Sequence, residues 1–396
     1  MDRSIKKSIS ANELKYIFGP SKISEDKQAK LIPALFENPD SDGTYLLKED
    51  IRTLSDLEKK VREIIDNQDG ISAILNIFSV KGDLVIPVEL RDVLFSNVNL
   101  AFFVGAGVSK LLGIPLWDEI AEHAIDYLRD HNEINHSEAL TLRNEKHSSK
   151  QILSILHRRM SDRQPAIRKF YENYLKSKES SKLNPYGLLF EIEKALDKPV
   201  LKISTNIDLE WEKILKGKEE KRKQETDERG QLVTPRSYYE KTQDCEFTRN
   251  QKLSASILYQ IHGSVRDLDG AILTTEKYVN SYRDENGLKG FLENLFKEYV
   301  VLFIGSSIRE FEILEHCLKH SPREHYALVA TGMSDNNLFR LNKAYFSGIK
   351  IKALPYYLDF QGYDRLLILL QSWADQIGSV KKKPFYADVQ AIDEVL

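Results

Sequence analysis

The sequence predicts an α/β fold, a doubly wound and mainly parallel sheet of about six strands, and two observations support this. From residue 97 onward, short apolar runs alternate with longer amphipathic stretches. The short runs are too brief for helices and are rich in Val, Ile, Leu and Phe, as buried parallel strands are. In addition, polar and glycine-rich motifs follow several of these runs, where open parallel sheets bind ligands.

The expected strands, in chain order, cover residues 100–104, 200–204, 257–261, 300–304, 326–330 and 349–353. Between them, apolar residues recur at spacings of three and four, which indicates helices. We expect these helices at residues 117–130, 167–175, 186–196, 288–296 and 364–376. The pattern is that of a Rossmann-like domain with a helical accessory region.

The first 96 residues follow a different pattern. A helix is expected at residues 55–66, and a short apolar run at 84–86 stops at Pro87. We therefore predict an N-terminal module at residues 1–96 that makes oligomer or partner contacts. The α/β domain should cover residues 97–380, and residues 381–396 should form a tail.

Composition excludes several classes of protein. The chain has 396 residues, 41% of them hydrophobic and 30% charged, so it should bury a sizeable core rather than stay disordered. A net charge of −3 creates no global field toward nucleic acid or anionic membranes. No secretory signal or apolar run of membrane-spanning length is apparent, so we expect a cytoplasmic protein that does not bind membranes.

The turn after the first expected strand has the sequence GAGVSK. Gly105 and Gly107 flank Ala106, and glycines at such a turn let the backbone approach a pyrophosphate at a helix N-terminus. Ser109 adds a hydroxyl donor. Lys110 stands where the dinucleotide fingerprint has its third glycine, so the motif alone also fits an ordinary tight turn.

Three more motifs follow later strands. STNID places Asn206 and Asp208 after the second strand, and HGS places His262 after the third. GSS places Gly305, Ser306 and Ser307 after the fourth. With GAGVS and the GIPLW that includes Ile114, Pro115 and Trp117, these motifs resemble the ordered motifs of the sirtuin family over residues 97–375.

The resemblance implies that NAD⁺ is bound as a substrate and that residues 97–380 form the catalytic domain. It implies NAD⁺ contacts from Gly105, Ala106, Gly107, Ser109, Ile114, Pro115, Trp117, Asn206, Asp208, His262, Gly305, Ser306 and Ser307. Asn206 would orient the ribose hydroxyls or the attacking water, and His262 would be the general base. Asp208 would orient Asn206 or its loop. A core position for Trp117 fits the sequence equally well.

The sequence also departs from the deacylating sirtuins. Those enzymes carry a four-cysteine zinc module, and the isolated Cys245 and Cys317 cannot form one, so we expect no metal and no zinc lobe. The chain is instead similar to a divergent bacterial sirtuin-like branch of antiphage defence effectors. This implies an NAD⁺ glycohydrolase (an NAD⁺ nucleosidase) that releases nicotinamide and ADP-ribose and depletes NAD⁺ in abortive infection.

An NAD⁺-depleting enzyme has to be held inactive in healthy cells. By resemblance to defence operons, we expect a HerA-type hexameric ATPase as partner, with a short Argonaute as the alternative. DNA would be engaged through that partner. Ring-shaped partners impose symmetry, so we also expect a homo-oligomer of this chain.

Other functions remain open from the sequence. The chain could be a non-catalytic module that senses NAD⁺ or ADP-ribose, or a nuclease component of a DNA-engaging ATPase complex. For the latter, Lys213 to Lys223 could contact phosphates, although a solvated helix or loop is the plainer interpretation of the whole charged stretch at residues 213–229. Glu315, His316, Cys317 and His320 form a rival metal cluster without a recognised ligand order. A protein deacylase is the least favoured alternative.

Overall fold

The structure, a computed structural model, describes residues 8–10, 24–37, 39, 44–52, 54–66, 71, 74–75, 84–145, 147–177, 183–222, 237–307, 313, 315–316, 319, 321–332, 336–358 and 362–382. The chain divides into two compact units. One comprises Met1–Ile86, Val329–Ala344 and Pro355–Leu369, and the other Pro87–Leu328, Tyr345–Leu354 and Leu370–Leu396. The boundaries expected from the sequence, after residues 96 and 380, stay predictions. Within the described residues, no helix has the length and apolar character needed to span a membrane.

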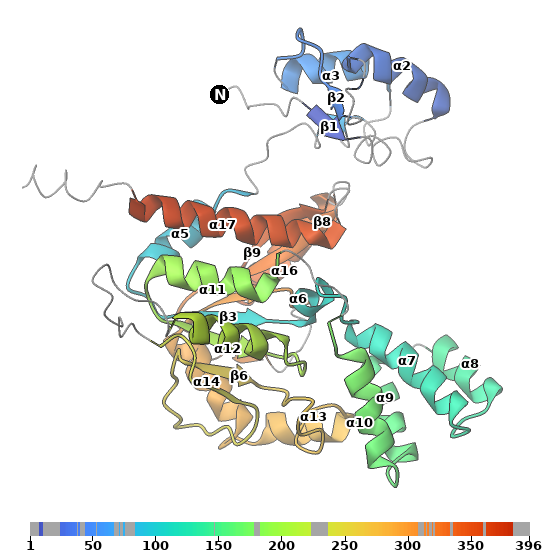
Figure 1. Cartoon of the computed structure of the whole chain (residues 1–396), viewed down its shortest axis with the longest axis vertical. Coiled ribbons are helices and arrows are strands. Elements are labelled where there is room, and N and C mark those ends of the chain that lie inside the picture. Colours follow the sequence, from blue (N-terminus) through green and yellow to red (C-terminus); the bar gives the residue numbers. More distant parts are fainter. Residues whose placement is uncertain are drawn as a thin grey trace, which may run out of the picture. The chain divides into compact units, whose positions relative to one another are not determined.

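The N-terminal residues form a small hydrophobic core of their own. Strand β1 (Ser8–Ser10) pairs antiparallel with β2 (Thr44–Leu46), alongside helices α2 (Glu25–Leu35) and α3 (Leu54–Arg62) (Figure 1). The helix expected at residues 55–66 is α3, which ends four residues earlier because residues 63–64 form a turn. The core residues are Leu31, Leu35, Phe36, Leu47, Ile51, Leu57, Val61, Ile65, Ile71 and Ile74.

A seven-stranded sheet with the order β5-β6-β4-β3-β7-β8-β9 confirms the predicted fold class. Strand β3 pairs in parallel with β4 and β7, and β4–β6, β5–β6 and β7–β8 are also parallel. The strands are β3 (Leu100–Val104), β4 (Val200–Ser204), β5 (Lys241–Gln243), β6 (Ile257–Gln260), β7 (Val300–Ile304), β8 (His325–Gly332) and β9 (Ile351–Leu358). All six expected strands are present. The additional β5 was missed because its sequence, KTQ, has no apolar residue.

The five helices expected from apolar periodicity are also present. They are α7 (Trp117–Asp130), α10 (Gln164–Tyr174), α11 (Pro185–Leu196), α14 (Leu288–Glu298) and α17 (Arg365–Lys382). The short helix α6 (Ala106–Lys110) is the one expected to follow the turn after the first strand. The sequence did not predict α5 (Val88–Phe95), α8 (His136–Asn144), α9 (Ser149–Arg159), α13 (Thr275–Arg283), α16 (Asn336–Gly348) or the 3-10 helix η2 (Gly362–Asp364). Residues 383–396 of the expected tail lie outside the described residues.

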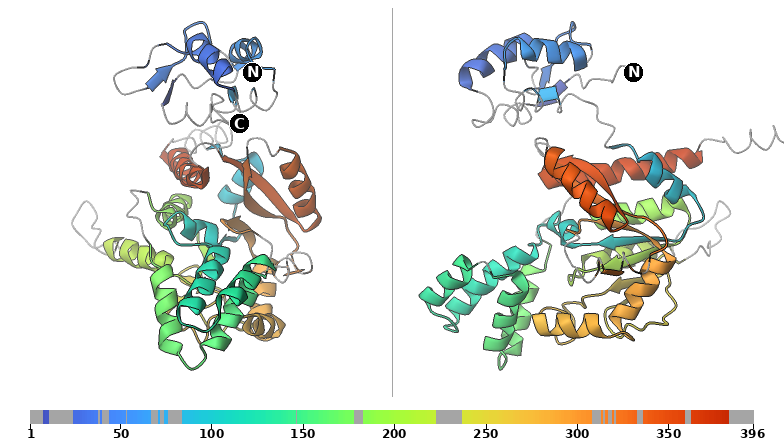
Figure 2. Two further views of the ribbon diagram at one scale, coloured as in Figure 1. Left: turned by 90° about the vertical axis from the view of Figure 1, so that its right-hand side faces the viewer. Right: turned by 180° about the vertical axis from the view of Figure 1, so that it is seen from behind.

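Helices α11 and α14 cover opposite faces of the sheet (Figure 2). On β4, the side chain of Lys202 reaches Glu193 of α11. Lys202 is in register with Leu258, so the next residue of β6, Tyr259, points to the other face, where it packs against Phe291 of α14. Coverage of both faces explains why the central strands are buried at every position and lack the alternation of a half-exposed sheet.

The predicted helical accessory region is formed by α7, α8, α9 and α10, which gather beside the sheet domain (Figure 1). They share one core with residues of the loops that follow β4 and β6. Ile207 and Leu268 are those loop residues, and they pack in the same cluster as Ile125 and Leu156 of the helices. Packing against this region therefore helps to fix the loops at the carboxyl ends of the strands.

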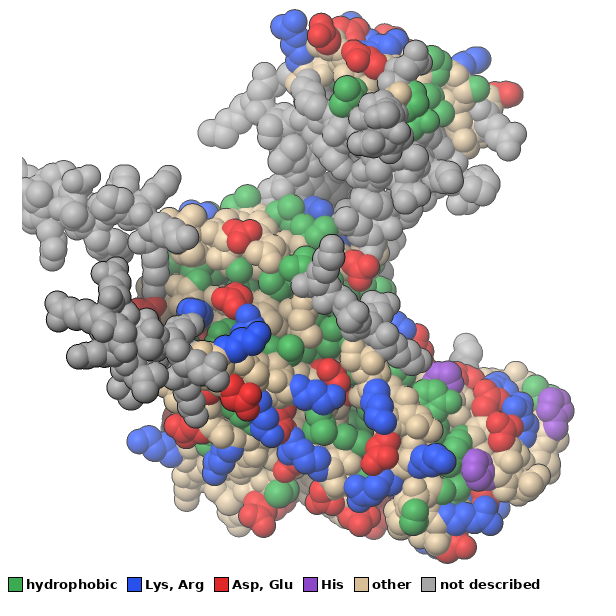
Figure 3. All heavy atoms as spheres, in the orientation of Figure 1, with side chains coloured by type: hydrophobic (Ala, Val, Ile, Leu, Met, Phe, Trp, Pro, Cys, Tyr) green, Lys and Arg blue, Asp and Glu red, His purple; other side chains and the backbone are tan. Residues whose placement is uncertain are grey.

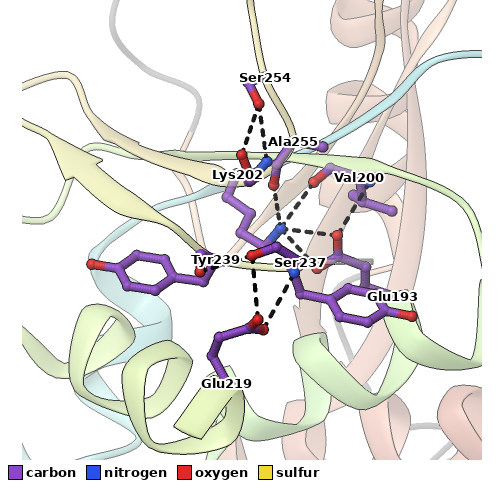
Figure 4. Close-up of polar contacts among 10 residues, drawn as sticks. Glu193, Val200, Lys202, Glu219, Ser237, Tyr239, Ser254 and Ala255 are labelled. Carbon is purple, nitrogen blue, oxygen red and sulfur yellow. Dashed lines mark hydrogen bonds and ion pairs between the residues drawn. The ribbon is translucent and has the colours of Figure 1, made fainter. Parts of the chain in front are cut away.

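The charged stretch at residues 213–229 begins within a helix, α12 (Glu210–Arg222), and residues 223–236 are outside the described part. The helix is less solvated than expected. Glu219 is buried and accepts hydrogen bonds from the Ser237 hydroxyl (3.2 Å) and the Tyr238 backbone N–H (3.3 Å), in the region shown in Figure 4. These bonds hold the segment that leads into β5 against α12.

A buried histidine at the start of β8 makes stability depend on pH. His325 is fully buried, its Nδ1 accepts the Val301 N–H (3.1 Å), and burial lowers its pKa from 6.5 to about 4. Because the folded pKa is depressed, the stabilisation is present above pH 6.5 and is lost as the pH falls toward 4. We expect the free energy of unfolding, measured in urea, to fall by about 2 kcal/mol between pH 7 and pH 5 from this group.

The matched variant is His325→Gln, which has no imidazole to protonate. Its stability at pH 7 should be lower, but its loss between pH 7 and pH 5 should be smaller than that of the wild type. An equal loss in both proteins would show that His325 is not the group responsible.

Candidate functional site

Four motifs predicted to be functional lie at one edge of the sheet. Strands β6, β4, β3 and β7 are consecutive neighbours and parallel, so their carboxyl ends point the same way. GAGVS follows β3, STNID follows β4, HGS follows β6 and GSS follows β7. The segments after β4 and β6 also run side by side, because the Val265 N–H donates to the Ile207 carbonyl (2.8 Å). This edge is where open α/β sheets bind ligands.

The first and fourth motifs touch through their glycines. The Gly107 N–H donates to the Gly305 carbonyl at 2.8 Å. A Cβ atom placed on either Gly105 or Gly107 would lie 2.7 Å from that same carbonyl oxygen. Gly305 has a φ of +61°, in the left-handed region that favours glycine. Ser306 beside it is half-buried, and Ser307 is exposed. The glycines of both motifs are therefore needed for this close backbone packing, whatever ligand binds there.

We expect Gly305→Ala to destabilise the protein. The positive φ alone costs a non-glycine residue roughly 1–2 kcal/mol, and its Cβ would lie 2.6 Å from the Val108 backbone nitrogen. The control is Gly217→Ala in the interior of α12, where the Cβ meets nothing within 4 Å. That variant should gain up to about 1 kcal/mol. Urea unfolding of both variants measures the contrast, and equal stabilities would contradict the packing described here.

The carboxamide of Asn206 is buried at the centre of the site. Its Nδ2 lies 3.0 Å from the Gly105 carbonyl, 2.9 Å from Ser109 Oγ and 3.1 Å from Tyr186 Oη. The Gly105 carbonyl only accepts hydrogen bonds, so the nitrogen, and not the oxygen, must face it. Within the described residues, Asn206 Oδ1 has no hydrogen-bond partner although the side chain is only 4% exposed.

Asp208 acts on Asn206 through Ser109. The Ser109 hydroxyl donates to Asp208 Oδ2 (2.6 Å), and the Glu210 N–H donates to Asp208 Oδ1 (3.0 Å). Burial raises the pKa of Asp208, while the Ser109 hydrogen bond lowers it, so burial prevails. The Ser109 proton is therefore used by Asp208 in this structure, and the expected contact of Ser109 with NAD⁺ stays a prediction.

Two polar residues of this site were not identified from the sequence. Tyr186, on α11, places its hydroxyl 2.7 Å from Ser109 Oγ. Gln260, the last residue of β6, donates from Nε2 to the carbonyls of Asn206 (3.0 Å) and Asp208 (2.7 Å). Tyr186 lies far from the motifs in sequence and looks like one apolar position of an amphipathic helix. Gln260 stands two residues before His262 at the end of an apolar strand, where a polar residue in an otherwise apolar run was the available signal.

His262 belongs to a second cluster at the same edge. Its Nε2 lies 2.9 Å from the hydroxyl of Tyr282 on α13, and the rings of Tyr278 and Tyr282 stand edge-on to the imidazole. Gly263 has a φ of +83° and packs against Ala271, which shapes the turn after His262. The histidine is 3% exposed. Tyr282 therefore fixes the ring orientation of the predicted base.

The GIPLW segment lies on the side of the helical region. Ile114 is buried in the shared core of α7–α10, and its N–H donates to the Ser109 carbonyl (3.2 Å). Pro115 is buried, while Ala106 and Trp117 are half-buried, and Trp117 packs against the same core. This packing is what a core aromatic residue would show, and a core position is the alternative role that the sequence allows for Trp117.

Two other groups of side chains were candidates for a nucleic-acid site and a metal site. Lysines 213, 216 and 218 of the predicted phosphate-contacting stretch pair with Glu210, Glu212 and Glu191. Figure 3 shows basic and acidic side chains mixed over the face drawn. Of the rival metal cluster, Cys317 and His320 lie outside the described residues, and in the part of the chain that is described no group of three metal-ligating side chains occurs.

Comparison with known proteins supports a sirtuin-like assignment. Residues 200–349 match the sequence model of a family described as a SIR2-like domain. The match includes Asn206, Asp208, His262 and Gly305, whereas GAGVS and Tyr186 precede it. SIR2-like domains are NAD-dependent enzymes in general, so the match implies NAD⁺ use. No curated protein matches the chain.

Proposed function

We propose that this SIR2-like chain is an NAD⁺ glycohydrolase, which cleaves the bond between nicotinamide and ribose. The observation that carries the proposal concerns Asn206, at the carboxyl edge of the sheet. Its buried Oδ1 has no hydrogen-bond partner within the part of the chain that the structure describes. A buried acceptor without a partner costs free energy, so a ligand donor at this position is favoured. The ribose hydroxyls of NAD⁺ are such donors.

The residues present fit the demands of the reaction. Breaking the glycosidic bond passes through an oxocarbenium-like state. Nicotinamide leaves as a neutral molecule with the bonding electron pair, so no strong acid is needed. Water forms the new bond to the ribose C1′ carbon and gives up a proton. The products are nicotinamide, ADP-ribose and H⁺.

Each protein group has one task in this scheme. Asn206 Oδ1 accepts a hydrogen bond from a ribose hydroxyl or from the attacking water and thereby orients it. His262 takes the proton of the water, and Tyr282 holds the imidazole in place. The close backbone contact of Gly105, Gly107 and Gly305 leaves peptide groups near the position proposed for the pyrophosphate.

The biological setting that we propose is antiphage defence in the cytoplasm. An enzyme that consumes NAD⁺ without restraint would harm the cell that makes it, so its activity has to depend on a trigger. We propose that a hexameric ATPase of the HerA type supplies this control, that DNA is engaged through it, and that several copies of this chain assemble with it.

The proposal is tested by incubating the purified chain with NAD⁺, alone and mixed with the candidate ATPase, and by quantifying nicotinamide. We expect nicotinamide to accumulate as NAD⁺ disappears. Tight binding of NAD⁺ with no turnover in the activated complex would replace the proposal with a sensing module. Release of nicotinamide only in the presence of an acylated peptide would indicate a deacylase.

A further inference from the structure

We propose that Tyr186 is a positioning residue for the reaction, an inference that rests on the proposed hydrolysis of NAD⁺. Its hydroxyl links the Asn206 carboxamide to the pair formed by Ser109 and Asp208. With this link, each group of the hydrogen-bond network has a fixed role as donor or acceptor, so the network has a single direction. Together with the Gly105 carbonyl, which already requires Nδ2 to face it, that direction holds Asn206 Oδ1 toward the substrate.

The direction follows from counting donors and acceptors. An ionised Asp208 carboxylate can only accept, so the Ser109 hydroxyl donates its one proton to it at 2.6 Å. At 2.7 Å from Ser109 Oγ, the Tyr186 hydroxyl must then be the donor to Ser109. Tyr186 Oη, at 3.1 Å, and Ser109 Oγ, at 2.9 Å, in turn share one proton of Asn206 Nδ2. The second amide proton is taken by the Gly105 carbonyl, at 3.0 Å.

Protonation of Asp208 would reverse this order. A protonated carboxyl can donate to Ser109, which would then donate to Tyr186 and leave the Tyr186 proton facing an amide nitrogen that cannot accept it. The ordered state therefore requires the ionised form. Burial raises the pKa of Asp208, Glu210 adds a like charge that raises it further, and Tyr186 is the other titratable group in contact with the network.

The Tyr186 ring is fixed independently of its hydroxyl. It is fully buried and stacks on Trp211 of α12, with ring centroids 5.4 Å apart and an interplanar angle of 19°. Tyr186→Phe keeps this stacking and removes only the hydroxyl. The variant therefore tests the hydrogen bonds of the network and not the packing.

We expect Tyr186→Phe to lower kcat for NAD⁺ about 10-fold with KM changed less than 2-fold, because a misdirected carboxamide loses contacts made in the transition state. In the plot of kcat against pH, the fall in kcat on the acid side should also move to higher pH; this part of the plot is the acid limb. The reason is that a Ser109 hydroxyl no longer polarised by Tyr186 stabilises the Asp208 carboxylate less. A merely structural tyrosine would not shift this limb.

The control is Tyr171→Phe on α10. Tyr171 is also fully buried, and its hydroxyl is also bonded, to His157 Nε2 at 3.1 Å, but it lies outside the site. Its kcat and pH profile should equal those of the wild type. If Tyr186→Phe behaves in the same way as this control while the wild type turns over NAD⁺, the positioning role is wrong. If the wild type releases no nicotinamide, the proposed function itself fails.

A measurement without turnover separates the two claims further. In protein labelled with ¹⁵N-asparagine, the Asn206 side-chain amide signal is assigned by its loss in Asn206→Ala. Both amide protons are bonded in the wild type, so they should exchange slowly with solvent, and at least one should exchange faster in Tyr186→Phe. Unchanged exchange in that variant would overturn the ordered network.

Discussion

Lys202→Met should lower the free energy of unfolding by about 3–5 kcal/mol, because the substitution leaves Glu193 as a buried charge without its cation. Lys202 lies in the middle of β4 and is 2% exposed. Its Nζ bonds Glu193 Oε2 at 2.8 Å, the Ala255 carbonyl at 2.7 Å and the Val200 carbonyl at 3.2 Å (Figure 4). Urea unfolding followed by circular dichroism measures the loss.

The control for this prediction removes both charges. In the double variant Lys202→Met with Glu193→Leu, no ion remains to be desolvated, and replacing buried pairs by apolar residues is often neutral or stabilising. We therefore expect the double variant to be more stable than Lys202→Met alone. If Lys202→Met is as stable as the wild type, the ion pair between Lys202 and Glu193 does not contribute to the free energy of unfolding.

His262→Ala should reduce kcat for NAD⁺ hydrolysis by roughly 10²–10⁴-fold, which is the usual contribution of a positioned general base. The side chain is 3% exposed and is held by the Tyr282 hydroxyl at 2.9 Å. The measurement is the initial rate of nicotinamide release at saturating NAD⁺. His262→Gln, which keeps a polar side chain of similar size, should show a comparable loss and guards against a packing defect.

His157→Ala is the matched control for His262. His157 is half-buried, and its Nε2, like that of His262, is bonded to a tyrosine hydroxyl, that of Tyr171 at 3.1 Å, but it lies in the helical region. Its variant should keep the wild-type kcat once the fold is verified. Equal loss in the two variants would show that damage to the fold, and not a missing base, explains the effect.

The central strands of the fold could be predicted because their sequences consist mainly of apolar residues. Strands such as β3 and β7 are apolar at every position, which is the mark of a sheet covered on both faces. Strand β5 could not be found in this way, because KTQ at the sheet edge buries no apolar side chain. Helix α5 directly follows Pro87 and has a weak amphipathic pattern, so the sequence offered no clear start or face.

The site was predicted as a set of strand ends, and the structure brings those ends to one edge. What the sequence could not provide is the connection between them. The side chain of Asp208 is linked to that of Asn206 through Ser109, and Tyr186 contributes from α11, a helix that carries none of the motifs. Such contacts depend on tertiary packing between segments about 20 to 100 residues apart, which no local spacing reports.

The most direct test of the central claim is hydrolysis of NAD⁺ in H₂¹⁸O, with the products analysed by mass spectrometry. We expect nicotinamide and ADP-ribose in equal amounts, with one ¹⁸O atom incorporated into ADP-ribose, and no such products from Asn206→Ala. Intact NAD⁺ after incubation with the activated complex, or products without ¹⁸O, would contradict this claim.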